Sequence, residues 1–219
     1  SAVGSNLFPT GLKETLMQFT EAENFGSLIR PMVGDVTDIR KILAEKNMSS
    51  NLLLFDTHQK VLKVLEQTEY LQPRYHVVIA NPPYMGNKGM NNQLKEFLKN
   101  NYSDYKSDLF GAFIVRNTEL AVPKGHLGFM SPFVWMFISS FEKLRLYIIE
   151  KKTITSLVQL EYSGFDGATV PICTFTIENQ NKPKYQGSYI RLSDFKGAEN
   201  QAPKTLEIIK NYNSYLMGA

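Results

Sequence analysis

The sequence predicts an α/β fold: a mixed sheet with helices between its strands, an antiparallel hairpin at one edge and a helical N-terminal segment. Between residues 76 and 160, short apolar runs that suit strands alternate with apolar residues at helical spacing. Two further strand-like runs then follow with only turns between them, which favours an antiparallel pair. Up to residue 72, the readable apolar patterns have helical spacing.

The N-terminal segment is expected to contain helices at residues 12–19 and 37–46. A longer helix should begin after Asp56, a residue type that caps helix N-termini, and should end before Pro73.

Five strands are expected in the rest of the chain, at residues 76–80, 127–130, 154–160, 170–177 and 185–192. The first run is almost continuously apolar, so we expect both of its faces to be covered, as in parallel sheets. Helices are expected near residues 94–98, after Ser107 as an N-cap, and after a capping box of Ser139 and Glu142. The polar residues 197–203 resemble a linker, and a final helix should follow them.

Composition narrows the function classes. The 219 residues suffice for a substantial core, and 24 basic against 21 acidic residues permit nucleic-acid binding without requiring it. A single cysteine, Cys173, excludes a disulfide framework within the chain and a cysteine-rich metal site, so no metal is expected. No apolar run reaches the roughly 20 residues of a membrane span, and the first residues do not resemble a signal peptide. We therefore expect a cytoplasmic protein with no membrane partner.

The sequence Asn81-Pro82-Pro83-Tyr84 directly follows the first strand. Ligands of open α/β sheets bind beyond the carboxyl ends of strands. The side-chain oxygen of Asn81 and the carbonyl of Pro82 are suited to accept both N–H bonds of an exocyclic amine, and the ring of Tyr84 can stack on a base. These residues are the catalytic candidates: the two acceptors make the amine more nucleophilic, so it can attack a methyl group. The alternative is a plain Pro-Pro turn with a surface tyrosine.

The motif and its surroundings resemble a known family. Val77-Val78-Ile79-Ala80-Asn81-Pro82-Pro83-Tyr84 looks like motif IV of the S-adenosylmethionine-dependent N6-adenine DNA methyltransferases. Residues 81–145, which begin NPPYMGNKGMNNQLKEFL, are similar to the large adenine methylases of bacterial phage-defence systems, the BREX or phage-growth-limitation type. Residues 12–31 and 54–78 resemble the same group.

The resemblance implies roles for further residues. Asp108, Leu109 and Phe110 match motif V, which lies near the cofactor's adenosine, although an ordinary capped helix explains them equally well. Phe165 falls in the region that helps to hold a flipped base, and Lys88 is a candidate for phosphate contact; a hairpin turn and a solvated loop are the alternatives. The implied partners are double-stranded DNA with its target adenine flipped out, and other phage-defence or restriction subunits.

The glycine-rich turn that binds S-adenosylmethionine is not found, since the 14 glycines include no Gly-x-Gly pair. We therefore expect a fragment: residues 1–72 as a mainly helical segment leading into the catalytic domain, 73–195 as the C-terminal half of a Rossmann-like catalytic domain, and 196–219 as a linker and helical tail. The isolated fragment should be inactive. The alternatives are a methylase of RNA or protein glutamine with the same motif, and a non-catalytic DNA-binding or assembly module.

Overall fold

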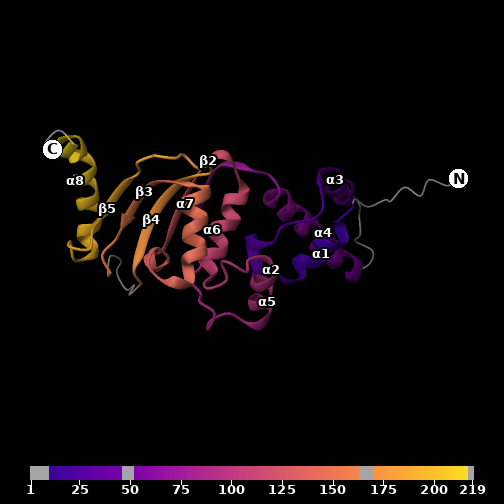
Figure 1. Ribbon diagram of the computed structural model, residues 1–219. Helices are drawn as coiled ribbons and strands as arrows, with labels where there is room; N and C mark the ends of the chain where they lie inside the picture. Colours follow the sequence, from indigo (N-terminus) through magenta and orange to yellow (C-terminus); the bar gives the residue numbers. More distant parts are fainter. Residues whose placement is uncertain (1–9, 46–51, 163–169, 217–219) are drawn as a thin grey trace. The chain divides into compact units, whose positions relative to one another are not determined.

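The computed structural model describes residues 10–45, 52–162 and 170–216 (Figure 1). The chain divides into two compact units, Ser1–Arg74 and Tyr75–Ala219. Each unit has its own apolar core.

The first unit is helical. It contains α1 (Leu12–Gln18), α2 (Ala22–Phe25), α3 (Thr37–Glu45) and α4 (Leu52–Leu71), with two short 3-10 helices, Phe19–Glu21 and Gly26–Leu28. The helices expected near residues 12–19 and 37–46 are confirmed. One apolar cluster in the described part of this unit joins buried residues from three segments of the chain: Leu12, Val33, Val36 and Leu65.

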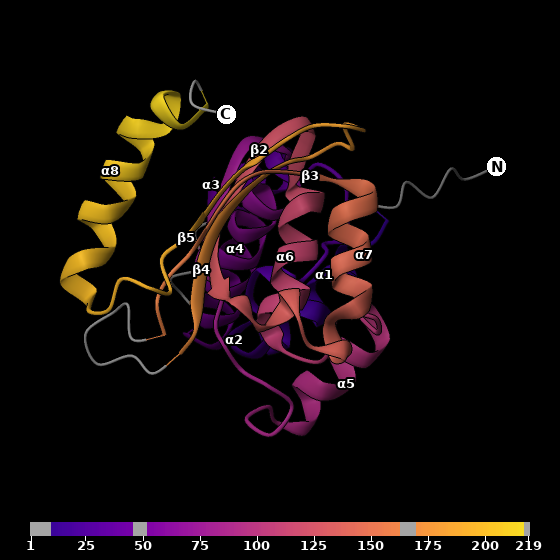
Figure 2. The same ribbon diagram turned by 60° about the vertical axis from the view of Figure 1, so that its left-hand side comes forward.

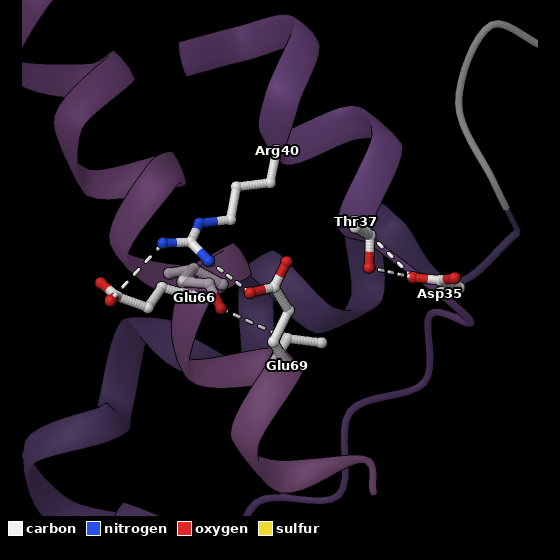
Figure 3. A network of polar contacts seen from close by, with 7 residues as sticks. Asp35, Thr37, Arg40, Glu66 and Glu69 are labelled. Carbon is white, nitrogen blue, oxygen red and sulfur yellow. Dashed lines mark hydrogen bonds and ion pairs between the residues drawn. The ribbon is translucent and has the colours of Figure 1, made fainter.

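Polar contacts tie the helices of this unit together (Figure 3). Arg40 on α3 pairs with Glu69 and, at 3.5 Å, with Glu66, both on α4. Asp35 lies two residues before α3, and its Oδ1 accepts a hydrogen bond at 2.9 Å from the backbone N–H of Thr37, the first residue of the helix.

The predicted start of α4 at Asp56 is wrong. The helix begins at Leu52 instead, because the leucines that precede Asp56 are good helix formers and extend it. Asp56 lies inside α4 and pairs with Lys60 one turn later, at 2.7 Å.

The second unit contains a five-stranded sheet in the order β1-β2-β4-β3-β5. The strands are β1 (Tyr75–Ala80), β2 (Ala121–Pro132), β3 (Thr153–Gln159), β4 (Ile172–Glu178) and β5 (Ser188–Arg191). β1 is parallel to β2, whereas β4 is antiparallel to both β2 and β3. The expectation that the last two strands form an antiparallel hairpin at the sheet edge is wrong, because β4 inserts between β2 and β3 and does not pair with β5. β4 lies inside the sheet, and β5, parallel to β3, forms the outer strand.

Helices α6 (Leu109–Leu120) and α7 (Glu142–Lys151) cover one face of this sheet (Figure 2). Phe110 and Ile114 from α6, with Leu144 and Ile148 from α7, pack against buried residues of the central strands: Leu127, Phe129, Leu157, Phe175 and Ile177. The short helix α5 (Asn92–Asn101) precedes α6, and α8 (Ala198–Leu216) follows β5. Among the described residues, no helix has the length and hydrophobicity that a membrane crossing requires.

The expectation that the first strand is covered on both faces is wrong. β1 is an outer strand of the described sheet, and its Val77 and Ile79 are 59% and 80% exposed. The continuous apolar run led to a wrong prediction of burial, because only its alternate residues, Val78 and Ala80, pack against the core.

Three predicted helix boundaries also differ. Asp108, and not Ser107, caps α6, and Ser107 Oγ donates to the carbonyl of Ser140 at 2.9 Å instead. Ser139 forms no side-chain cap, because residues Ser139–Phe141 make a 3-10 turn that runs into α7. The polar residues expected as a linker mostly belong to α8, where Gln201 Nε2 donates to the carbonyl of Gly197 at 3.0 Å.

Candidate functional site

The candidate site begins where β1 ends. Ala80 is the last residue of the strand, and Asn81-Pro82-Pro83-Tyr84 follows it at the carboxyl edge of the sheet. Neither proline donates a backbone hydrogen bond, so strand pairing stops there. The side chain of Asn81 is exposed, Pro82 is buried and Tyr84 is half-buried. The motif therefore presents an accessible amide, that of Asn81, and a partly accessible ring, that of Tyr84.

Asn81 and Tyr84 are linked by a hydrogen bond. The hydroxyl of Tyr84 donates to Oδ1 of Asn81 at 2.9 Å. Tyr84 also packs against two apolar clusters of the sheet unit, and this packing restricts the movement of its side chain. Burial raises the pKa of the Tyr84 phenol above its usual value, and the Cys173 thiol adds to this effect, so the hydroxyl stays a donor. A carbonyl oxygen has two lone pairs, so Asn81 Oδ1 keeps one for a ligand.

The segment after Tyr84 is held by Asp108. The backbone N–H of Met85 donates to Asp108 Oδ1 at 3.0 Å, and the N–H of Leu109 donates to the carbonyl of Met85 at 3.0 Å. The same Oδ1 caps α6 by accepting from the N–H of Phe110 at 3.3 Å. Burial raises the pKa of the Asp108 carboxyl group, while the three backbone N–H groups oppose that shift.

The three residues with a predicted cofactor role lie at the start of α6. Leu109 and Phe110 are buried, and the ring of Phe110 stacks on Phe141 at a centroid distance of 5.2 Å. The carboxylate of Asp108 is engaged with backbone amides. Among the described residues, these side chains form no cradle for S-adenosylmethionine, and their contact with a cofactor stays a prediction.

The two residues with a predicted substrate role are less defined. Lys88 lies exposed in a turn that is closed by the N–H of Gly89 and the carbonyl of Gly86 at 2.9 Å. This turn lies four residues beyond Tyr84 in the sequence. Phe165 falls outside the described residues.

A depression of about 310 Å³ lies on the face of the sheet opposite α6 and α7 and includes Asn81. Its other lining residues come mostly from alternate positions of the strands, with Gly128, Ser156, Thr174 and Thr176 among them. The hydroxyl of Thr176 bonds to those of Thr155 and Ser156, both at 2.6 Å. Sequence reasoning missed this hydroxyl group, although threonines alternate with buried residues along β4.

The fold and the motif together define a class. A mixed α/β sheet that carries Asn-Pro-Pro-Tyr at the carboxyl end of its first strand corresponds to the C-terminal part of a Rossmann-like methyltransferase fold. Residues 12–165 match the Eco57I restriction-modification methylase family, and the chain belongs to that family.

Two relatives of the chain are named adenine-specific methyltransferases. The chain is 31% identical over 210 residues to the adenine-specific methyltransferase BrxX of Escherichia coli O9:H4 (strain HS), with 93% of this chain and 17% of BrxX covered. It is 29% identical over 224 residues to the adenine-specific methyltransferase PglX of Lacticaseibacillus casei (strain Zhang), with 96% of this chain and 18% of PglX covered. The chain thus spans less than a fifth of the length of these relatives.

A solved structure supports the fold. The structure of a nuclease-deletion mutant of the Type ISP restriction-modification enzyme LlaGI, in complex with a DNA substrate mimic, superposes with a TM-score of 0.51 and 14% identity. The match covers 68% of this chain and 17% of that one. At this identity the likeness concerns the fold alone.

Proposed function

We propose that this chain forms the base-binding part of an enzyme that transfers a methyl group to the N6 amino group of adenine in DNA, within a restriction-modification or phage-defence system. The observation that carries the proposal is the hydrogen-bonded pair of Asn81 and Tyr84 at the carboxyl edge of the sheet. Membership of the Eco57I methylase family supports it, as do relatives that are named adenine-specific methyltransferases.

Asn81 and Pro82 would bind the amine. Asn81 Oδ1 accepts one N–H of the amino group through its second lone pair, and the carbonyl of Pro82 accepts the other. Both bonds draw electron density toward the nitrogen and orient its lone pair away from the acceptors. The nitrogen would then bond to the methyl carbon as the bond from that carbon to the donor's sulfonium sulfur breaks, with the electron pair staying on sulfur. The surplus proton on nitrogen would leave to solvent afterwards, so no strong base is needed beforehand.

Tyr84 would hold the plane of the base. Its ring supplies a flat apolar surface, and stacking on an aromatic side chain contributes about 1–3 kcal/mol per base. Because the hydroxyl of Tyr84 is bonded to Asn81, the stacking surface and the amine acceptor are oriented together.

S-adenosylmethionine is the proposed methyl donor, and it supplies an electrophilic methyl group. The side chains of Leu109 and Phe110 are buried, and that of Asp108 is bonded to backbone amides, so we propose no contact between these three side chains and the donor. The proposed partner is duplex DNA with the target base extruded, since an amine inside the helix cannot reach such a pocket. Lys88, in the turn that follows Tyr84 in the sequence, is the proposed contact with a DNA phosphate.

The test uses the full-length protein that contains this chain and S-adenosylmethionine with a labelled methyl group. Duplex DNA, RNA of the same sequence and a glutamine-containing peptide are offered in parallel, and the labelled product is identified by mass spectrometry. The proposal predicts N6-methyladenine in DNA. Label in RNA or glutamine would overturn the assigned substrate, and no label in any substrate would favour a non-catalytic DNA-binding or assembly module.

A further inference from the structure

We infer that Asp108 is a positioning residue: it fixes the backbone directly after Tyr84 and thereby holds Tyr84 and Asn81 in place for the reaction. This inference rests on the proposed function, because its consequence is a rate of methyl transfer. It assigns Asp108 a different task from the cofactor contact that the sequence resemblance implies.

The contact geometry is a two-sided clamp on one residue. The N–H of Met85 donates to Asp108 Oδ1 at 3.0 Å, and the carbonyl of Met85 accepts from the N–H of Leu109 at 3.0 Å. Gly86, the next residue, forms an isolated antiparallel bridge with Asp108. Both backbone polar groups of Met85 are therefore bound by two consecutive residues, which leaves the end of the motif little freedom.

The other side of the clamp is rigid. Leu109 and Phe110 are buried in the core, so the first turn of α6 cannot rotate without exposing them. A Cβ atom added at Gly111 would lie 3.1 Å from the carbonyl oxygen of Tyr105, so the helix start also packs closely against the preceding loop. A clamp that is attached to this turn holds Met85 to the core of the unit.

One oxygen atom has two tasks. Asp108 Oδ1 accepts from Met85 and also from the N–H of Phe110, so the helix cap and the clamp depend on the same acceptor. Asparagine offers an oxygen of the same geometry and can keep both bonds, whereas alanine loses both. The required property is thus the acceptor and not the negative charge.

The clamp bears on catalysis through Tyr84. This residue is held at its hydroxyl by Asn81 and at its carboxyl-terminal neighbour by Asp108. If the second hold is released, the ring and Asn81 Oδ1 can shift together. A displacement on the order of 1 Å at a reacting group costs on the order of 100-fold in rate.

The experiment compares Asp108→Ala, Asp108→Asn and the wild type in the full-length protein. Asp35→Ala is the matched control, because Asp35 also accepts a backbone N–H two residues ahead of it at a helix start, but in the helical unit. Hydrogen exchange of peptides that span Met85 reports on the clamp, and kcat and the KM for S-adenosylmethionine report on its consequence.

We expect exchange at Met85 to be about tenfold faster in Asp108→Ala, and kcat to fall about 100-fold with KM for S-adenosylmethionine unchanged. Asp108→Asn should stay within about threefold of wild type in every readout, and Asp35→Ala should leave kcat unchanged. Unaltered exchange at Met85, or a raised KM for S-adenosylmethionine in Asp108→Asn, would overturn the inference, the latter in favour of a cofactor contact. If the wild type methylates no adenine, the proposed function fails, while the exchange result still decides for or against the clamp.

Discussion

The hydroxyl of Tyr84 and the side-chain oxygen of Asn81 are 2.9 Å apart. This hydrogen bond connects the two parts of the proposed base-binding site, the stacking ring of Tyr84 and the amine acceptor of Asn81. It has a chemical consequence: one lone pair of Asn81 Oδ1 is used within the protein, so the amine must approach along the other. The direction of approach, and not only the presence of an acceptor, is therefore set by Tyr84.

Tyr84→Phe separates orientation from stacking. The variant keeps the ring but loses the bond to Asn81, so we expect kcat to fall about fivefold to tenfold, in line with one lost hydrogen bond of about 1 kcal/mol. Tyr84→Ala removes the ring as well and should raise the KM for DNA at least about tenfold. Steady-state kinetics of the full-length protein measure both. Equal kinetic defects in the two variants would contradict a separate role for the hydroxyl.

The Asp108 carboxyl group predicts a pH dependence of stability. Burial raises its pKa in the folded state, so the fold disfavours the ionised form. Its contribution to stability is full below the ordinary carboxyl pKa and is lost as the pH rises through the folded-state pKa. Asp108→Asn lacks this titration, so the free energy of unfolding of the variant should rise relative to that of the wild type as the pH increases above the ordinary carboxyl pKa of about 4. Urea denaturation across this range is the measurement, and a constant difference would contradict the assignment.

At this scale the sequence predicted the motif residues but not their contacts. Asn81, Pro82, Pro83 and Tyr84 are contiguous, and a strand end followed by two prolines indicates their place directly. The bond between Met85 and Asp108 joins residues 23 positions apart across a loop and a helix. No periodicity reports such a pairing, since it depends on where α5 and its flanking turns place the start of α6.

At the scale of elements, the presence of a strand was easier to predict than the burial of its two faces. The apolar run of β1 indicated a strand, but its exposure follows from its place in the sheet, and burial depends on neighbours that are distant in sequence. The N-caps failed for a similar reason: Ser107 and Ser139 are suitable residue types, but the hydroxyl of Ser107 bonds to the 3-10 turn that precedes α7, and Ser139 lies within that turn.

Asn179 provides a test at this scale. It follows β4, and its Nδ2 lies 3.0, 2.9 and 3.1 Å from the carbonyls of Thr118, Ala121 and Val122, at the junction of α6 and β2. Asn179→Ala leaves these carbonyls without their donor, so we expect a loss of about 1–3 kcal/mol in the free energy of unfolding. Asn87→Ala, at an exposed loop position, should change it by less than about 0.5 kcal/mol. Urea denaturation of both variants gives the comparison, and equal effects would contradict the role assigned to Asn179.

At the scale of the whole molecule, the chain consists of two units with separate cores. The division lies at Arg74, immediately before β1. The helical content of the first unit was predictable from its apolar spacing, whereas contacts between its helices, such as that of Arg40 with Glu69, are not revealed by spacing.

Separate cores predict separate unfolding. Trp135, the single tryptophan of the sequence, lies buried in the sheet unit and reports on that unit alone. Leu65→Ala in the helical unit should lower its stability by about 2–5 kcal/mol and shift part of the circular dichroism transition, but leave the Trp135 fluorescence midpoint unchanged. Leu144→Ala, an equally buried leucine of the sheet unit, should shift the fluorescence midpoint. A common shift of both signals in both variants would mean that the units unfold as one.

The central claim is that Asn81 binds the amine that is methylated. Its most direct measurement is the single-turnover rate of N6-methyladenine formation by the full-length protein with Asn81→Ala, together with the DNA affinity of the same variant. Removal of a preorganised polar group from a reacting centre costs on the order of 100-fold to 1000-fold in rate. We predict a loss of at least this size with DNA affinity within a few-fold of wild type, and methylation at the wild-type rate would contradict the account.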